Sequence, residues 1–383
     1  MNSFVRFTPR GQTKFLGALC SFGLAIILVA GLWPFHAPLN DVHWSSPARG
    51  LIFGKHGSLL STSQLRRQPP VTGQPCSLEI YLQPRRPDYA GTILGFYFLD
   101  RRDSGFILRQ SLNDLKIESR SKSGSRKKLY VDAFSAAKPI VISIVSAEKG
   151  TSVYLDGALA RTSSVVRLST EDLAGRLVLG NAPSTTDSWS GKLMGLAVYD
   201  RELSAVEVSQ HVSGWSRSRA PVDGEGALAS YAFDEGAGTR LHSRAHGAPD
   251  LFIPERFFVL DEPFLRCPWD EFSPGRNYWE DVAINVFGFV PLGLCFSAYL
   301  SRTRTASRAL FLAVAIGFTT SLWIEVLQSF LPTRNSGMTD LITNTFGTLL
   351  GAVVWAWAVN HGWLERFFPA TDEKKGETRG SFN

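Results

Sequence analysis

Polar side chains that could do chemistry recur in helical pairs within apolar stretches near the end of the chain. They are Asp281 and Asn285, Glu325 and Gln328, and Asp340 and Asn344, with Arg334 standing alone. Residues three or four apart lie on one face of a helix. Ionisable groups are costly inside a bilayer unless they pair or reach water, so by default they mark a function or a partner. We therefore expect these seven residues to form a ligand-binding pocket, with Arg334 contacting an anionic part of the ligand.

This set of residues does not resemble a catalytic centre. It holds no nucleophile–base pair, and none of the seven histidines lies in these stretches. We name no catalytic residue and no metal ligand. Two alternatives stay open: a membrane-embedded enzyme with Glu325 as general base, and a structural arrangement in which Glu325 pairs with Arg334 while the amides satisfy each other and the helix ends.

Four apolar stretches must position these residues, and each is long enough to cross about 30 Å of hydrocarbon at about 1.5 Å per residue. They are residues 15–33, 282–300, 309–331 and 341–359. The first could instead be a cleaved signal peptide, but no small-x-small cleavage site follows Trp33. Gly347 and Gly351 form a G-x-x-x-G face that would let a neighbouring helix approach closely.

Lysine and arginine gather in segments that a four-span topology places on one side. These segments are the tail 1–14, the loop after the second span with Arg302, Arg304 and Arg308, and the tail 360–383. Because such loops stay cytoplasmic, we expect both termini in the cytoplasm and residues 34–280 outside. The seven polar residues would then share the outer end of the bundle in a bacterial-type cell membrane.

The middle of the chain is rich in short β-type runs separated by Gly, Asp, Asn, Ser and Pro, which predicts a sandwich or barrel. Leu78, Ile80 and Leu82 alternate as a half-buried strand requires. Asp156-Gly157 predicts a hairpin turn, and the spacing of Ser204 and Glu207 predicts a capping box that starts a short helix.

This region resembles the laminin-G-like, concanavalin-A-like jelly roll, which we place at residues 41–270. The resemblance lies in "VYLDGALA", "LVLGN" and "SGKLMGLAVYDRELSAVEV". Residues 228–233 look like that family's first strand although they follow the helix. Because the terminal strands of a jelly roll lie side by side, we expect them to complete the sheet; the alternative is a free linker.

Relatives of this fold bind sugars or proteins, and some hydrolyse glycans, but the glucanase pattern E-x-D-x-x-E is absent. The resemblance therefore implies binding, with a structural spacer or protein-contact module as the alternative. Calcium at the rim stays open, although no ligand set stands out. A disulfide between Cys76 and Cys267 is chemically allowed outside the cell, and two unpaired thiols are the other possibility.

A basic run at 116–128 holds six cations against one glutamate and predicts an exposed hairpin. Such a patch attracts polyanions, so anionic envelope polymers are candidate partners of Lys122, Arg126, Lys127 and Lys128. The alternative is a solvated face. Nucleic acid is not expected, because no aromatic side chains interleave the cations and the domain lies outside.

Residues 281–359, about 80 in all, resemble the VanZ-like family of membrane proteins. Its D-x-x-x-N-x-x-x-F-x-P-x-G segment is matched by Asp281, Asn285, Phe289, Pro291 and Gly293. Its E-x-x-Q, P-x-R and D-x-x-x-N-x-x-G segments are matched by Glu325, Gln328, Pro332, Arg334, Asp340, Asn344 and Gly347. The resemblance covers 281–359, with the jelly roll inserted after the first helix. The family name comes from glycopeptide (teicoplanin) resistance, and no activity attaches to these residues.

We thus expect an α+β multidomain protein: a transmembrane four-helix unit plus an all-β jelly-roll sandwich. It would be a non-catalytic envelope protein whose jelly roll binds glycan or anionic polymer. Its membrane pocket would bind a lipid head group or lipid-linked glycan without a cofactor, with a link to teicoplanin-type resistance. An enzyme acting on a lipid-linked precursor and a structural scaffold are the alternatives; ligand identity and oligomeric state are not predicted.

Overall fold

The chain folds as two compact units. The computed structural model describes residues 9–45, 49–65, 73–120, 125–217, 226–272 and 275–361. One unit, the membrane unit, combines Met1–His36 with Pro263–Asn383, and the other, the jelly roll, is Ala37–Glu262. Residues 263–270, which we had expected in the jelly roll, therefore belong to the membrane unit.

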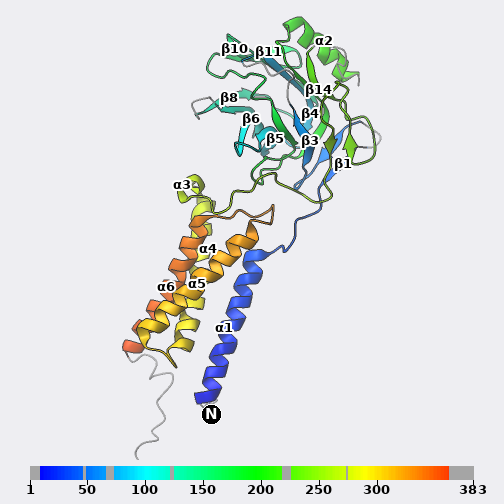
Figure 1. Cartoon of the computed structure of the whole chain (residues 1–383). Coiled ribbons are helices and arrows are strands. Elements are labelled where there is room, and N and C mark those ends of the chain that lie inside the picture. Colours follow the sequence, from blue (N-terminus) through cyan, green and yellow to red (C-terminus); the bar gives the residue numbers. More distant parts are fainter. Residues whose placement is uncertain are drawn as a thin grey trace, which may run out of the picture. The chain divides into compact units, whose positions relative to one another are not determined.

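The membrane unit is built from four long helices and one short helix (Figure 1). They are α1 (Pro9–Leu32), α3 (Pro268–Glu271), α4 (Arg276–Leu300), α5 (Ala306–Gln328) and α6 (Met338–Asn360). The four long helices are each long and apolar enough to cross a membrane, as in a membrane protein. The helix α6 begins earlier than the apolar run suggested, and Asp340 lies in its first turn instead of before it.

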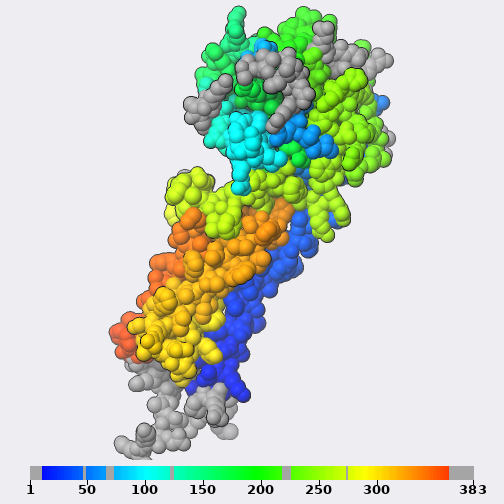
Figure 2. Space-filling view, viewed as in Figure 1, coloured from blue at the N-terminus to red at the C-terminus, as the bar shows by residue number. Residues whose placement is uncertain are grey.

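Small residues let α6 press directly on α4. A Cβ atom added to Gly347 would lie 2.1 Å from the carbonyl oxygen of Val286, and one added to Gly351 would lie 2.1 Å from that of Val290. The predicted close approach at the G-x-x-x-G face is thus confirmed. The helix α1 lies along the others (Figure 2), where Leu28 packs against the apolar cluster that includes Ile324.

The second unit is a jelly-roll sandwich of two antiparallel eight-stranded sheets. The first sheet runs β1 (Val42–Trp44), β2 (Leu51–Phe53), β13 (Gly191–Tyr199), β4 (Cys76–Pro84), β9 (Ile140–Ala147), β10 (Gly150–Leu155), β11 (Ala158–Ser163), with β14 (Ala227–Tyr231) also on β13. The second runs β15 (Arg240–Leu241), β16 (Leu251–Phe252), β3 (Leu59–Leu65), β12 (Gly175–Leu179), β5 (Ala90–Phe98), β6 (Asp103–Ser111), β7 (Asp114–Arg120), β8 (Arg126–Asp132).

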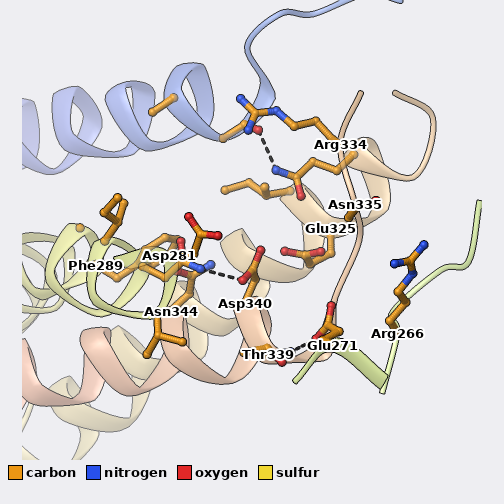
Figure 3. Close-up of a pocket in the computed structure, with 18 of the residues that line it drawn as sticks. Arg266, Glu271, Asp281, Phe289, Glu325, Arg334, Asn335, Thr339, Asp340 and Asn344 are labelled. Carbon is orange, nitrogen blue, oxygen red and sulfur yellow. Dashed lines mark hydrogen bonds between the residues drawn. The ribbon is translucent and has the colours of Figure 1, made fainter. Parts of the chain in front are cut away.

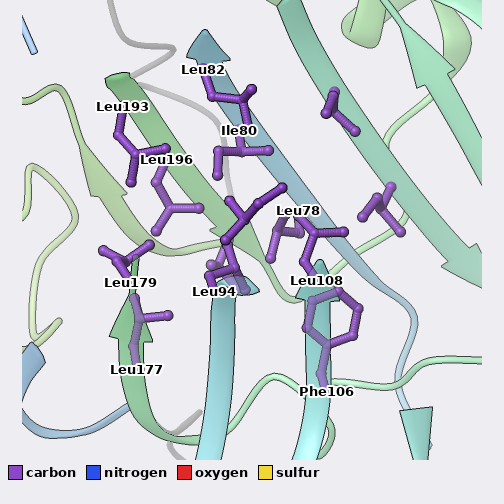
Figure 4. Close-up of a cluster of buried hydrophobic side chains, with 14 of the residues drawn as sticks. Leu78, Ile80, Leu82, Leu94, Phe106, Leu108, Leu177, Leu179, Leu193 and Leu196 are labelled. Atoms are coloured by element: carbon purple, nitrogen blue, oxygen red, sulfur yellow. The ribbon is translucent and has the colours of Figure 1, made fainter. Parts of the chain in front are cut away.

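The two sheets enclose one apolar core between their inner faces. Leu78, Ile80 and Leu82 of β4 meet leucine and phenylalanine side chains of the opposite sheet, such as Leu94 and Phe106 (Figure 4). The strand β4 is not half-buried as its alternation suggested, because a helix covers its other face too. That helix is α2 (Ala205–Ser216), and its Val208 and Trp215 pack on the outside of the first sheet.

Several local predictions for this unit are confirmed. The strand β14 pairs with β13, opposing Leu196 to Tyr231, so the strand that follows the helix does complete the sheet. Asp156 and Gly157 take positive φ values of 49° and 85° in the β10–β11 hairpin. Both hydrogen bonds of the predicted capping box are present in α2. Of the two possibilities left open for the cysteines, the structure has the unpaired one: Cys76 in this unit and Cys267 in the membrane unit are both free thiols.

Replacing Gly351 by alanine should lower the stability of the membrane unit. The new methyl group would collide with backbone atoms of α4, which cannot move aside as a flexible side chain can, and overpacking costs about 1–3 kcal/mol. Thermal unfolding of the full-length protein in detergent measures the loss. Gly23→Ala on α1 is the matched control, since no atom lies within 4 Å of its added Cβ. Equal melting of Gly351→Ala and wild type would contradict the close approach.

Stability of the jelly roll should decline in acid through Glu207. Hydrogen bonds from the backbone N–H and hydroxyl of Ser204 hold the pKa of Glu207 at about 2. A depressed pKa contributes stability above the unfolded value of about 4.3, and this contribution is lost as pH falls towards 2. The melting temperatures of wild type and Glu207→Gln should therefore converge between pH 6 and pH 2. The exposed control Glu148→Gln should show no such convergence.

Candidate functional site

A polar cavity of about 680 Å³ lies in the membrane unit, between the C-terminal ends of α1 and α5 and the N-terminal ends of α4 and α6. All seven residues predicted to form a pocket line it: Asp281, Asn285, Glu325, Gln328, Arg334, Asp340 and Asn344. Figure 3 shows Asp281, Glu325 and Asp340 turned towards a common space, while Arg334 lies beside α1. The structure thus brings the predicted set together, and its role in ligand binding stays a prediction.

Two carboxyl groups cap the start of α6. Oε2 of Glu325 accepts a hydrogen bond from the backbone N–H of Gly337 at 2.8 Å, and Oε2 of Glu271 accepts one from Thr339 at 3.0 Å. The first N–H groups of a helix lack partners within it, and its N-terminal end favours negative charge. These two acids therefore have a clear structural task at this helix end.

Two further cavity residues cap the end of α1. The amide of Gln328 donates to the carbonyl oxygen of Gly31 at 2.8 Å, and Nε of Arg334 donates to that of Trp33 at 3.1 Å. The carbonyl groups in the last turn of a helix also lack partners within it. The expected pairing of Glu325 with Arg334 is wrong, because each side chain is engaged by a different helix end.

The two asparagines do not satisfy other amides, contrary to the structural alternative. Asn285 donates to Oδ1 of Asp340 at 2.7 Å, and Asn344 donates to the hydroxyl of Ser321 at 3.0 Å. The NH₂ group of Asn344 is therefore used within the helix bundle. Its side-chain carbonyl oxygen, Oδ1, makes no hydrogen bond within the described residues.

Five cavity-lining residues carry a buried oxygen that makes no hydrogen bond within the described part of the chain. These oxygens are Oε1 of Glu325, Oε1 of Gln328, Oγ1 of Thr333, Oγ1 of Thr339 and Oδ1 of Asn344. The side chains of Glu325, Gln328 and Asn344 belong to residues that are only 0%, 8% and 4% exposed. A buried polar group without a partner costs about 1–3 kcal/mol. The cavity is therefore suited to a ligand that donates hydrogen bonds.

The charge of the cavity lining also favours a ligand that donates hydrogen bonds. Carboxyl groups come from Asp270, Glu271, Asp281, Glu325 and Asp340, against guanidinium groups from Arg266 and Arg334. Five acids and two cations favour a cationic or hydroxyl-rich ligand over an anionic one. Within the described residues, no group of three or more His, Cys, Asp or Glu could hold a metal ion.

Further lining residues, which the sequence did not predict, come from the segment before α4, from the turn before α6 and from the first turn of α6. They include Arg266, Asp270, Glu271, Thr333 and Thr339. The segment joins that turn through backbone bonds: Arg266 donates to Ser336 at 3.1 Å and accepts from Met338 at 2.9 Å. Such pairing between residues 70 apart leaves no periodic signal in the chain. The acidic pair Asp270-Glu271, close to a predicted span, was the signal in the sequence that could have indicated these lining residues.

The basic run of the jelly roll does form the predicted hairpin, from β7 and β8. Much of its charge is neutralised, however. Lys116 and Arg126 form ion pairs with Glu118, and Arg120 pairs with Asp103. Lys127 and Lys128 lie on β8, and Lys122 lies outside the described residues. Polyanion binding at Lys122, Arg126, Lys127 and Lys128 stays a prediction.

Comparison with protein families confirms both resemblances. Residues 241–359 match the family VanZ/LLP1, and residues 60–209 match the concanavalin A-like lectin/glucanases superfamily. The chain thus joins a VanZ-like region to a concanavalin-A-like domain. Among curated proteins, none matches.

The chain is also similar to several solved structures. The receptor binding domain of botulinum neurotoxin D is 15% identical, with 47% of each chain covered and a TM-score of 0.32. A putative carbohydrate binding protein from Bacteroides ovatus is 14% identical, with 52% of this chain and 59% of that chain covered and a TM-score of 0.37. A pentraxin from Limulus polyphemus is 17% identical, covering 58% and 94%, with a TM-score of 0.34. The chain spans about half the length of the toxin domain, and at this identity the likeness concerns the fold alone.

Arg334→Met should loosen the end of α1. The variant keeps a long side chain but leaves the carbonyl group of Trp33 without its donor, which costs about 1–3 kcal/mol. Amide hydrogen exchange at residues 29–33 of the full-length protein should therefore become faster by about tenfold or more. Arg302→Met, in the loop at the other end of α5, should leave this exchange unchanged. Unchanged exchange in Arg334→Met would show that the arginine does not cap α1.

Proposed function

We propose that this protein is a membrane-embedded receptor for an amphiphilic envelope component, with the head group of the ligand bound in the polar cavity. One observation supports the proposal above all: five residues that line a single cavity each carry a buried oxygen that has no hydrogen-bond partner among the described residues. Its volume, about 680 Å³, falls in the range of small-molecule sites.

The proposed head group is rich in hydrogen-bond donors. A primary ammonium group, as in an ethanolamine lipid, would suit the acidic lining, and sugar hydroxyls would suit the amide and threonine oxygens. Both chemistries satisfy acceptors that the protein leaves open. An anionic group read by Arg334 fits less well, because that guanidinium already donates to α1 and acids outnumber cations around it.

A separate apolar groove of about 410 Å³ lies between α1 and α5. Leu24 and Leu28 line its α1 side, and Thr320 and Trp323 line its α5 side. The cavity-lining residue Ile324 follows Thr320 by four positions, which is about one helical turn. We assign the groove to an acyl chain of the same ligand, so the site would accept a lipid and not a free sugar.

The topology and the role of the jelly roll belong to the same proposal. The basic segments favour cytoplasmic termini, and the cavity would then open to the outer side, where envelope precursors and glycans are found. The jelly roll would contact envelope glycan. Capture of an envelope lipid would also explain a link to teicoplanin-type resistance. Comparing the teicoplanin susceptibility of cells that make the wild-type protein with that of cells that make Glu325→Gln tests this link.

Glu325→Gln tests the site and separates the two head-group chemistries. Glutamine keeps an acceptor for the N–H of Gly337 but removes the negative charge. Retention of phosphatidylethanolamine by the full-length protein, measured by native mass spectrometry, should fall about tenfold. Retention of a diglucosyl diacylglycerol should fall less than about threefold. Glu280→Gln is the matched control, because Glu280 is exposed on α4 and pairs with Arg276.

The same measurement can contradict the proposal. If neither lipid is retained better than plain diacylglycerol, which has the chains without the head group, the polar cavity does not bind a head group and the scaffold alternative holds. If a retained lipid is instead converted to a product and Glu325→Gln stops the conversion, the protein is an enzyme.

A further inference from the structure

A second and smaller polar cavity lies at the opposite end of the helix bundle. Its volume is about 170 Å³, and it is enclosed by the end of α4, the start of α5 and the end of α6. Polar groups on its wall come from Ser297, Ser301, Arg304, Trp355 and Asn360. Among the described residues no carboxyl group lines it, in contrast to the larger cavity.

The start of α5 contributes the positive end of a helix. Ala306, the first residue of this 23-residue helix, lines the cavity. The N-cap residue Thr305 makes no side-chain capping bond, and the first turn holds no acidic residue. The first N–H groups of a helix have no partner within it and favour an anion.

Arg304 adds a full positive charge next to this helix start. A guanidinium group presents several N–H donors in one plane and binds the oxygens of phosphate groups in pairs. No acid of the described residues lines the cavity, so none of them neutralises this arginine from the cavity wall. The local field therefore attracts anions.

The third feature is a buried hydroxyl group without a partner. Ser297 is 2% exposed, lines the cavity, and its Oγ makes no hydrogen bond within the described residues. The neighbouring Ser301 differs, because its hydroxyl donates to Ala298 at 3.0 Å and accepts from Nε1 of Trp355 at 3.3 Å. Ser297 thus retains a hydroxyl donor for a ligand, whereas that of Ser301 is used by the protein.

We propose that this cavity binds a phosphate group, held by Arg304, by the start of α5 and by the hydroxyl of Ser297. The size of the cavity suits one phosphate group and excludes a whole nucleotide or lipid. The phosphate could belong to a phospholipid whose chains stay in the membrane, or it could be inorganic phosphate. This site is separate from the head-group cavity, and its failure would leave the proposed function untouched.

The experiment uses the full-length protein in detergent with two probes. Native mass spectrometry measures retention of dimyristoyl phosphatidylglycerol, with dimyristoyl glycerol as the lipid that lacks phosphate. Thermal unfolding in increasing sodium phosphate, against sodium chloride at equal ionic strength, measures inorganic phosphate. Binding of the phospholipid or of inorganic phosphate should fall about tenfold in Arg304→Gln and about threefold in Ser297→Ala. Arg302→Gln, in the same loop but not on the cavity wall, should stay within twofold of wild type.

Each result decides the question. Loss of phospholipid binding in Arg304→Gln supports a lipid phosphate, and loss of phosphate-dependent stabilisation supports a soluble one. Equal retention of the lipids with and without phosphate, together with no effect of inorganic phosphate, would overturn the site. So would equal losses in Arg302→Gln and Arg304→Gln, because general attraction to a basic loop would then explain the binding.

Discussion

The ends of helices in a membrane protein must find hydrogen-bond partners, and this requirement shapes the polar end of the bundle. The last carbonyl groups of α1 and the first N–H groups of α6 both lie next to the larger cavity. Gln328 and Arg334 donate hydrogen bonds to the carbonyl groups at the end of α1. Glu325 and Glu271 accept hydrogen bonds from the N–H groups at the start of α6. The interior of a bilayer offers no water to unpaired backbone groups, so side chains of the protein take the place that solvent has in a soluble protein. The residues that suggested a binding site are also the residues that allow the helices to end here.

Capping alone does not account for everything these side chains present. Each capping carboxyl or amide group has two polar atoms, and only one of them bonds to the helix end. Oε1 of Glu325 and Oε1 of Gln328 remain without a partner in the described structure, as does Oδ1 of Asn344, whose NH₂ group is engaged. A bundle under selection for stability alone would bury apolar groups there, so the surplus acceptors are the part of the arrangement that stability does not explain.

The two ends of α5 offer opposite chemistry. Its C-terminal end borders a cavity rich in acids and open acceptors, and its N-terminal end borders a small cavity with an arginine, a hydroxyl group and no acid. With 23 residues at about 1.5 Å each, the two sites are separated by about the thickness of a bilayer. A phospholipid in one leaflet and a donor-rich amphiphile in the other would each meet complementary groups.

Much of this could be predicted from the chain alone, because it depended on local spacing. The four apolar stretches, the paired polar residues, the G-x-x-x-G face, the capping box and the Asp156-Gly157 turn are all set by neighbours within about one helical turn or one hairpin. The tertiary structure decided what depends on distant segments. Arg334 bonds to Trp33 and not to Glu325, because the end of α1 arrives beside it from 301 positions earlier. Glu271 reaches α6 in the same way, and α2 buries the outer face of β4. Spacing reveals which side chains share a face, but which distant helix end or strand meets that face is settled only when the whole chain packs.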